Sequence, residues 1–200
     1  MRYPTSRYEK QLLSEGFARI AGVDEAGRGA WAGPLVAAAV ILPFPHRIIG
    51  LNDSKKLSPA RREQLYGKIC AVAAWSVSIK GQTDIDAHGV GRMNTEALID
   101  AVRKLKPQPD FVLVDALRIA LSIPSKSIVH GDALTQSIAA ASIVAKVTRD
   151  RLMQALHRVY PRYVFDAHKG YGTPSHARAI RAYGISGEHR RSFAPMRLMV

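Results

Sequence analysis

Residues 17–42, FARIAGVDEAGRGAWAGPLVAAAVIL, decide the fold of this chain. The apolar run from Phe17 to Asp24 predicts a strand, and the glycines that follow predict a turn. Residues 35–42 are apolar throughout, which is typical of a strand buried on both faces. Two carboxylates, Asp24 and Glu25, stand where the first strand is expected to end. The stretch therefore predicts a buried sheet with acidic side chains at a strand end.

The segments outside this stretch predict further strands and helices around the same sheet. Helices are expected at 4–16, from Ser58-Pro59 onward, at 92–106, at 134–158 and at 174–183; strands are expected at 48–51, 75–80 and 111–114. Residues 75–80 alternate Trp75, Val77 and Ile79 with polar residues, the pattern of a half-buried strand. No Pro/Gly/Ser-rich linker interrupts the chain, so we expect one domain with a C-terminal extension packed onto it.

The composition excludes several classes of protein. The chain has 200 residues, of which 47% are apolar and 22% charged, as in ordinary globular domains. Its longest uncharged apolar stretch, 30–44, is shorter than the roughly 20 residues that a membrane-spanning helix needs. The N-terminus has no signal-peptide core, and the single Cys70 excludes an internal disulfide. We therefore expect a cytoplasmic protein with no membrane association.

The charge is strongly positive and unevenly distributed. Lys and Arg number 29 against 16 Asp and Glu, a net charge of +13. Residues 101–200 hold 16 basic and 6 acidic residues, so this half carries +10 of that excess. Clustered positive charge is typical of proteins that bind a polyanion, and it favours nucleic acid as the partner.

Four carboxylates stand at strand ends or at a helix start. Besides Asp24 and Glu25, Asp115 ends the run FVLVD, and Asp132 precedes the helix expected at 134–158. Singly, Asp115 also fits a turn residue and Asp132 a helix cap. Together the four suit a two-metal phosphoryl-transfer centre, because hard divalent cations take oxygen ligands. Asp24 and Glu25 can share a site only if the strand ends or kinks there, since successive strand residues point to opposite faces.

A competing motif occupies the same turn. Residues 27–32, GRGAWA, match G-x-G-x-x-G/A, and Asp53 follows 21 residues after Ala32, as in a dinucleotide-binding fingerprint. We reject this interpretation because Gly33-Pro34 and a strand-like run follow, where the fingerprint requires a helix. Two carboxylates beside the turn would also repel a pyrophosphate that lacks a metal.

The C-terminal half offers further candidate residues. Ser142 and Lys146 lie four residues apart in the predicted helix, on one face, where Lys146 can neutralise a phosphate. Asp150 is interpreted as one partner of a surface ion pair. Tyr171, between two glycines, is expected to project from a loop and stack on a sugar or base, the alternative being a tyrosine packed on its neighbours. Four histidines match no zinc pattern, so phosphate contacts or surface positions are expected for His157, His168, His176 and His189.

Five stretches taken together resemble bacterial ribonuclease HII, the type 2 ribonuclease H family. They are GVDEAGRGAWAGPLVAAAV (22–40), LNDSKKLS (51–58), FVLVDA (111–116), HGDALTQSIAAASIVAKVTRD (130–150) and HKGYGTPSHARAIRAYGISGEHRRSFAP (168–195). The resemblance implies an α/β ribonuclease H-like fold, a five-stranded mixed sheet flanked by helices. It implies a single catalytic domain over 1–200, of which about 160–200 is a family-specific helical C-terminal extension.

The same resemblance implies roles for particular residues. The catalytic metal ligands map onto Asp24, Glu25, Asp115 and Asp132, and the metal is Mg²⁺ or Mn²⁺. A loop that senses the ribonucleotide 2′-hydroxyl through backbone groups maps onto Gly27, Arg28 and Gly29. Tyr171 is implied to sense the RNA–DNA junction, and Lys55 and Lys146 to approach substrate phosphates. Ser142, on the same helix face as Lys146, is also expected to bind substrate. Two departures, Trp31 and the pair Ala116-Leu117 after Asp115 where glycine is frequent, fall outside the catalytic positions.

The predicted function is that of a metal-dependent endoribonuclease. It would cleave RNA in RNA–DNA hybrids and incise 5′ of ribonucleotides embedded in duplex DNA, leaving 3′-hydroxyl and 5′-phosphate ends. The expected partners are these nucleic acids, and the protein is expected to be a monomer. One alternative is a non-catalytic nucleic-acid-binding protein, which would bind without cleaving. Another is a metal-dependent DNA nuclease of the same fold, which would cleave an all-DNA duplex.

Overall fold

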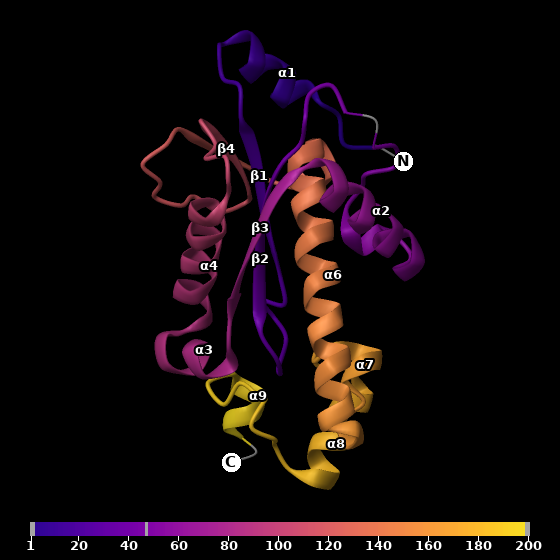
Figure 1. Cartoon of the computed structure of the whole chain (residues 1–200). Helices are drawn as coiled ribbons and strands as arrows, with labels where there is room; N and C mark the ends of the chain where they lie inside the picture. The colour runs from indigo at the N-terminus through magenta and orange to yellow at the C-terminus, as the bar shows by residue number, and fades with distance from the viewer. Residues whose placement is uncertain (1–2, 47, 199–200) are drawn as a thin grey trace.

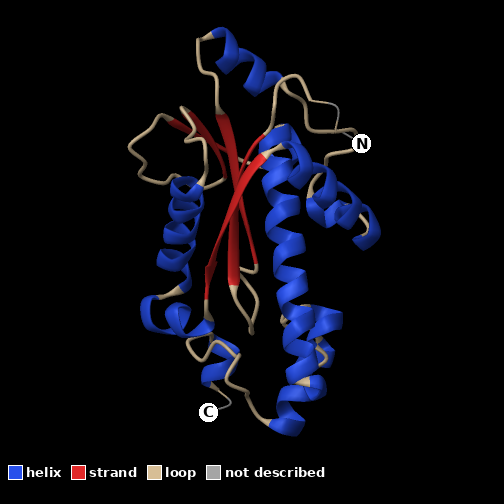
Figure 2. Ribbon diagram, in the orientation of Figure 1, coloured by secondary structure: helices blue, strands red, loops and turns tan. Residues whose placement is uncertain are grey.

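The computed structural model describes residues 3–46 and 48–198, built around one five-stranded sheet (Figures 1 and 2). The strands, in the order β3-β2-β1-β4-β5 across the sheet, are β3 (Ala74–Lys80), β2 (Leu35–Ile41), β1 (Ile20–Ala26), β4 (Phe111–Asp115) and β5 (Ser125–Ile128). β1 runs antiparallel to β2 and parallel to β4. The predicted α/β fold with a five-stranded mixed sheet is confirmed.

Helices cover both faces of this sheet. The α-helices are α1 (Arg7–Ser14), α2 (Pro59–Val72), α3 (Gln82–His88), α4 (Val90–Lys104), α5 (Gly131–Leu134), α6 (Gln136–Val159), α7 (Phe165–His168), α8 (Pro174–Tyr183) and α9 (Ala194–Arg197). Short 3-10 helices span Ser54–Lys56 and Pro161–Tyr163. The long α6 crosses one face and α4 the other (Figure 1). None of the helices in the described ranges is both long and apolar enough to cross a membrane.

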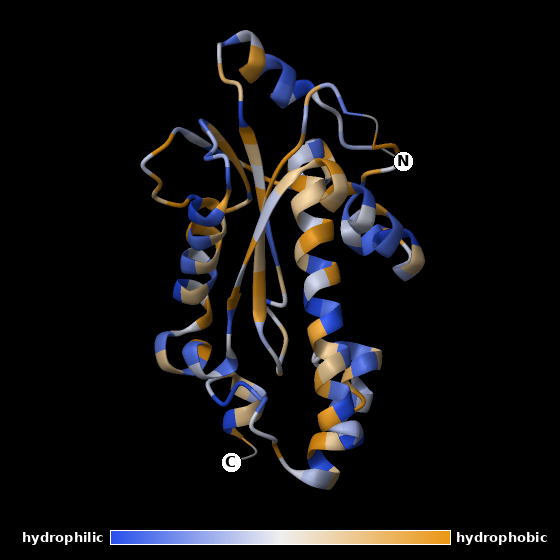
Figure 3. Cartoon of the chain, in the orientation of Figure 1, coloured by the Kyte–Doolittle hydropathy of each residue, from blue (hydrophilic) through white to orange (hydrophobic). Residues whose placement is uncertain are grey.

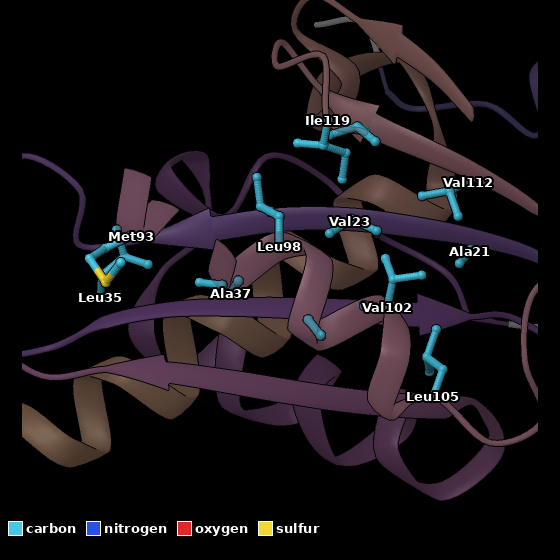
Figure 4. Close-up of a cluster of buried hydrophobic side chains, with 14 of the residues drawn as sticks. Ala21, Val23, Leu35, Ala37, Met93, Leu98, Val102, Leu105, Val112 and Ile119 are labelled. Atoms are coloured by element: carbon cyan, nitrogen blue, oxygen red, sulfur yellow. The ribbon is translucent and has the colours of Figure 1, made fainter. Parts of the chain in front are cut away.

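Small residues let the two helices approach the sheet closely. β2 is buried at every position and has three alanines, Ala37 to Ala39, at its centre. Figure 4 shows the cluster on the α4 side, where Leu98 and Val102 pack on Val23. On the other side, a Cβ added to Gly22 would lie 2.1 Å from the backbone of Ser137, so α6 is in backbone contact with β1. In Figure 3 orange stretches mark the central strands, and α2 is mainly blue.

One predicted strand is absent from the part of the chain that the structure describes, and one strand of the sheet was not predicted. Residues 48–51 form a turn, and the fifth strand is instead β5, which the sequence analysis did not predict. β5 is a short edge strand, SKSI, whose first two residues are exposed, so it lacks an apolar signal. It pairs in parallel with β4 and is recognisable only from that partner.

The alternation predicted for 75–80 is present, with the opposite face buried. Ser76 and Ser78 are buried, and the Ser76 hydroxyl donates to the Ala101 carbonyl of α4. Trp75 and Ile79 are instead 39% and 47% exposed. β3 lies at the edge of the sheet, where helix cover is partial, and small serines allow α4 to pack closely against it.

The C-terminal segment after α6 folds back along the end of that helix. α7 and α8 lie beside the end of α6, and α9 lies near α3, on the opposite side of the sheet (Figure 1). Between α8 and α9, His189 forms an antiparallel bridge with Ala32, in the loop between β1 and β2. The loop after the first strand is therefore held by residues near the end of the chain.

Candidate active site

Asp24 and Asp115 lie side by side on neighbouring strands. β1 and β4 are parallel and pair Val23 with Val114, so the next residues along each strand are adjacent. Ala26 and Leu113, each two residues from one of these aspartates, pack in clusters that include residues of α6. Because strand residues two apart share a face, both carboxylates point toward α6. Asp24 is buried and its Oδ1 accepts a hydrogen bond of 2.7 Å from the Glu25 amide.

Glu25 occupies the other face of the same strand. The strand neither ends nor kinks at this point: β1 continues to Ala26, and Glu25 pairs with Ala37 of β2. The two carboxylates therefore do not lie on one face, and they can share a site only around the end of β1, one residue beyond Glu25. They remain close enough that the Glu25 charge raises the pKa of Asp24.

Asp132 reaches the same region from the first turn of α5. It is buried, and the preceding Gly131 amide donates a 2.7 Å hydrogen bond to Oδ1 of Asp115. Burial raises the pKa of Asp132, and the charges of Asp53 and Asp115 raise it further. Three of the predicted ligands, Asp24, Asp115 and Asp132, are thus brought together from two strands and a helix start.

The four carboxylates form one electrostatic cluster. Burial raises the pKa of Asp24 well above its ordinary value, and Glu25 and Asp115 add to that effect. Burial also raises the pKa of Glu25, opposed first by the Arg28 charge. For Lys55 partial burial lowers the pKa, but carboxylates that include Asp24 and Asp132 outweigh it, so the net shift is upward. The carboxylate cluster, defined as Asp24, Glu25, Asp115 and Asp132, is therefore a site where bound cations relieve repulsion.

The donor set suits a hard divalent cation in its chemistry. All four predicted ligands are carboxylates, the oxygen donors that Mg²⁺ and Mn²⁺ prefer. Among the residues that the structure describes, no three Asp, Glu, His or Cys side chains converge tightly enough to enclose one ion as they lie. An ion held by three of these carboxylates would require their side chains to rotate.

A pocket of about 380 Å³ opens beside the cluster. Its lining comprises all seven residues predicted to bind substrate, together with Glu25, Ala26 and Ser54; the seven are Gly27, Arg28, Gly29, Lys55, Ser142, Lys146 and Tyr171. Gly27 has a φ of +91°, and a Cβ there would lie 1.9 Å from the Arg149 Nε. A Cβ on Gly29 would meet no protein atom within 4 Å. The first glycine is needed by the fold, while the second leaves the pocket wall bare.

Tyr171 lies in a loop and packs on its neighbours; stacking on a sugar or base stays a prediction. The half-buried side chain lines the pocket, and its ring lies over the Arg149 guanidinium at 5.2 Å and the Lys146 Nζ at 5.9 Å. Lys146 also pairs with Asp150 at 2.7 Å, as an ion pair that is largely buried and not at the surface as expected. Ser142 shares a hydrogen bond of 2.9 Å with Ser54.

The expectation for the histidines is wrong for three of the four. His168, His176 and His189 are buried together against Tyr163 and Phe165, away from any surface role. His157 is half-buried, with Nδ1 3.3 Å from a carboxylate oxygen of Asp166. The three histidines lie in segments separated by turns, so no periodic pattern in the sequence indicated their burial.

Several residues at the site were missed by sequence reasoning. Asp53, considered only within the rejected dinucleotide motif, lies beside Asp132 and raises its pKa. Asn94 of α4 lies beside Glu25 and lowers the pKa of that carboxyl, but its buried amide has no hydrogen-bond partner within reach among the described residues. Arg149 and Arg190 are fully buried and bond to the loop between β1 and β2. Their burial follows from contacts with that distant loop, and no local pattern signals it.

Trp31, one of the departures noted in the sequence, packs within this region. A Cβ on Gly172 would lie 2.2 Å from the Trp31 ring, and the ring is 5.7 Å from that of His176. The other departure is also informative, because Ala116 has a φ of +51°, a conformation that glycine adopts more easily.

Comparison with known proteins shows what this chain is similar to. A family model described as Ribonuclease HII matches residues 21–196. Ribonuclease HII of Geobacillus thermodenitrificans is 53% identical over 193 residues, covering 96% of this chain and 74% of that protein. The ribonuclease H2 of Pyrococcus horikoshii superposes with a TM-score of 0.79 at 28% identity, over 91% and 97% of the two chains. Bst-RNase HIII, solved in complex with Mn²⁺, shares the fold at a TM-score of 0.68 and 21% identity, over 90% and 68%.

Proposed function

The chain belongs to the ribonuclease HII family of metal-dependent endoribonucleases, and on this premise we propose that it incises 5′ of ribonucleotides embedded in duplex DNA. It would also cleave the RNA strand of RNA–DNA hybrids and leave 3′-hydroxyl and 5′-phosphate ends. The observation that carries the proposal is one pocket whose lining includes Glu25, Tyr171 and the glycine loop, defined as residues 27–29. The other three carboxylates lie beside it. Membership of an enzyme family sets aside the non-catalytic alternative.

The carboxylate cluster is the proposed metal site. Asp24, Asp115 and Asp132 would hold Mg²⁺ or Mn²⁺ together with Glu25 from the adjacent face. The chemistry supplied by two bound divalent ions is activation of a water for attack and stabilisation of the leaving 3′-oxygen. The Gly131 amide fixes Asp115 through its 2.7 Å hydrogen bond, so one ligand is oriented before any ion arrives. Lys55 supplies positive charge close to the same carboxylates.

Residues 27–29 and Tyr171 are proposed to choose the cleavage position. RNA differs from DNA by the 2′-hydroxyl, which both donates and accepts hydrogen bonds. The bare backbone at Gly29 lets amide and carbonyl groups approach that hydroxyl, since no side chain intervenes. The Tyr171 ring would stack on the neighbouring deoxyribose, where an added 2′-hydroxyl would crowd it. Arg149 and Lys146 beneath the ring add positive charge for the adjacent phosphates.

We further propose that residues 160–200 belong to the catalytic domain. The bridge between Ala32 and His189 and the hydrogen bonds from Trp31 and Ala32 amides to the Gly170 carbonyl support this. The tail would thus form one wall of the substrate site, bearing Tyr171.

The direct test uses a DNA duplex that carries one ribonucleotide, assayed with and without Mg²⁺ or Mn²⁺. We expect metal-dependent incision 5′ of the ribonucleotide. Stacking on an aromatic ring is worth about 1–3 kcal/mol, so Tyr171→Ala should slow incision roughly 5- to 150-fold. The loss should be smaller on a continuous RNA–DNA hybrid, where no deoxyribose follows the cut. Tyr171→Phe should keep most of the activity because the ring face is preserved.

An all-DNA duplex of the same sequence is the control substrate. Its cleavage at a comparable rate would support the DNA nuclease alternative. Equal losses on both ribonucleotide substrates for Tyr171→Ala would show that the tyrosine is a general binding residue and does not sense the junction.

A further inference from the structure

Residues 188–190 pair with the loop that follows β1. The Gly33 amide donates to the Glu188 carbonyl at 2.9 Å, and the Arg190 amide donates to the Trp31 carbonyl at 2.8 Å. This short antiparallel pairing fixes the position of His189 and Arg190 relative to the loop, and their side chains point into the interior. Both side chains are buried, with 1% and 0% of their surface exposed.

The Arg190 side chain donates three hydrogen bonds to the loop between β1 and β2, one of them to Arg28 in the glycine loop. Its Nη1 donates to the Arg28 carbonyl at 2.9 Å, and its Nε and Nη2 donate to the Gly33 carbonyl at 3.0 and 2.9 Å. Among the described residues no carboxylate lies within ion-pair distance of this guanidinium, so backbone carbonyls carry its solvation. A buried guanidinium is expensive unless its donors are satisfied, which makes these bonds strong constraints on the loop.

Arg149 of α6 constrains the other end of the same loop. Its Nε donates to the Pro34 carbonyl at 2.8 Å and its Nη2 to the Ala32 carbonyl at 3.2 Å. The guanidinium also lies beneath the Tyr171 ring. The two arginines together therefore take four carbonyls of residues 28–34, and neither reaches the pocket directly.

His189 reaches Tyr171 through a second histidine. The Ser186 amide donates to His189 Nδ1 at 2.9 Å, so this nitrogen carries no proton and the proton is on Nε2. His189 Nε2 then donates to His176 Nε2 at 3.1 Å, which leaves the His176 proton on Nδ1. His176 Nδ1 donates to the Tyr171 carbonyl at 3.0 Å. The chain of donors is consistent only when both imidazoles are neutral, and it ends on the backbone of Tyr171.

From these contacts we propose that His189 and Arg190 are positioning residues that fix the separation between the glycine loop and Tyr171. The two residues are adjacent in sequence. Arg190 donates to the Arg28 carbonyl, and His189 donates to His176, which donates to the Tyr171 carbonyl. The distance between the glycine loop, which would contact the ribose, and Tyr171, which would contact the neighbouring deoxyribose, is thereby fixed. This inference rests on the proposed function of Tyr171 and the loop. It adds that discrimination depends on a buried pair that contacts no substrate.

The test measures the ratio of two rates, incision at a single embedded ribonucleotide over cleavage of a continuous hybrid. Arg190→Lys keeps the charge but not the three-bond geometry, and we expect it to lower this ratio about tenfold, as small misplacements do. His189→Leu should lower it similarly, whereas His189→Gln, which can still donate to His176, should restore most of it. Arg191→Lys is the matched control, because the Arg191 side chain is exposed, and it should leave the ratio unchanged.

A double-mutant cycle with Tyr171→Ala separates positioning from general structural damage. In that background the Arg190 and His189 variants should change the ratio less than twofold, because the surface that they position is gone. An unchanged ratio in the single variants, or the same tenfold fall with and without Tyr171, would overturn the inference. If Arg190→Lys does not fold, as judged by its thermal melt, the comparison of His189→Leu with His189→Gln decides.

The two proposals fail in distinguishable ways. Tyr171→Ala that acts equally on both substrates contradicts the proposed role of Tyr171. A selective Tyr171→Ala effect beside non-selective Arg190 and His189 variants contradicts only the positioning inference.

Discussion

The carboxylate cluster and the buried basic residues behind the glycine loop solve the problem of buried charge in opposite ways. Asp24 and Asp132 are buried beside other carboxylates, and their pKa values are raised. Arg149 and Arg190 are buried to the same degree, but backbone carbonyls accept most of their hydrogen bonds. In the first region Lys55 and Arg28 offset only part of the carboxylate charge, so these pKa values stay raised. In the second region backbone carbonyls satisfy most of the guanidinium donors, and Arg149 Nη1 has no hydrogen-bond partner among the described residues. The proposed metal site is therefore left with repelling charges, whereas the buried arginines beside the pocket are held in place by backbone carbonyls.

The sharpest test of the comparison removes charge from the unsatisfied side. Asp24→Asn keeps the size of the side chain and an oxygen that can accept from the Glu25 amide. We expect cleavage to fall at least about a thousandfold, since the metal supplies several kcal/mol of transition-state stabilisation. Without metal the melting temperature should rise, because an acid whose pKa is raised in the folded state destabilises that state when ionised. Hybrid binding should persist. Near wild-type turnover would remove Asp24 from the site.

A pair of glycine variants distinguishes what the fold needs from what the ligand needs. Gly27→Ala places a Cβ against the buried Arg149 at a positive φ, and we expect it to destabilise the protein by about 3 kcal/mol. Gly29→Ala meets open space, so stability should change by no more than about 0.5 kcal/mol and the melting temperature should stay within about 2 °C of wild type. Incision at an embedded ribonucleotide should nevertheless fall, because the methyl group faces the pocket. Full activity in Gly29→Ala would contradict close backbone approach to the substrate.

Lowering the pH should change the free energy of unfolding in opposite directions through the buried histidines and through the carboxylate cluster. Burial lowers the pKa of both His176 and His189 to about 4, from an ordinary value of 6.5. Between those values the unfolded chain binds more protons, so their contribution is complete above pH 6.5 and is lost toward pH 4. The loss is at most about 3 kcal/mol per histidine. The carboxylates with raised pKa values act oppositely, since protonation relieves their repulsion.

Urea unfolding at pH 7 and pH 4.5 measures the sum of these effects, and His189→Gln isolates the histidine part. We expect the variant to lose less stability than wild type over this range. Identical pH dependence in the two proteins would show that the histidine pair is not held neutral.

The smallest expected effect concerns the backbone beside Asp115. Ala116 adopts a φ of +51°, which disfavours a residue with a Cβ. Ala116→Gly should therefore stabilise the protein by about 0.5–1 kcal/mol, after the greater chain entropy of glycine is subtracted. Ala155→Gly, in the helical backbone of α6, is the control and should destabilise it by about 1 kcal/mol. A loss of stability in Ala116→Gly would show that this turn carries no strain.

The sequence alone determined the features that depend on neighbouring residues. Continuous apolar runs predicted β1, β2 and β4, the Ser58-Pro59 pair predicted the start of α2, and the motifs predicted which carboxylates to examine. All seven predicted substrate-binding residues line one pocket. Their roles in catalysis remain predictions.

Tertiary structure alone decided the features that depend on distant partners. It determined which face of β3 is buried, that β5 pairs with β4, and that Asp53 lies beside Asp132. Arg190 illustrates the reason: in sequence it is one arginine among several in a basic tail, and its bonds are to Gly33, 157 residues away. Burying such a side chain is favourable only where another segment supplies hydrogen-bond acceptors. Its burial therefore depends on both segments and cannot be inferred from either one alone.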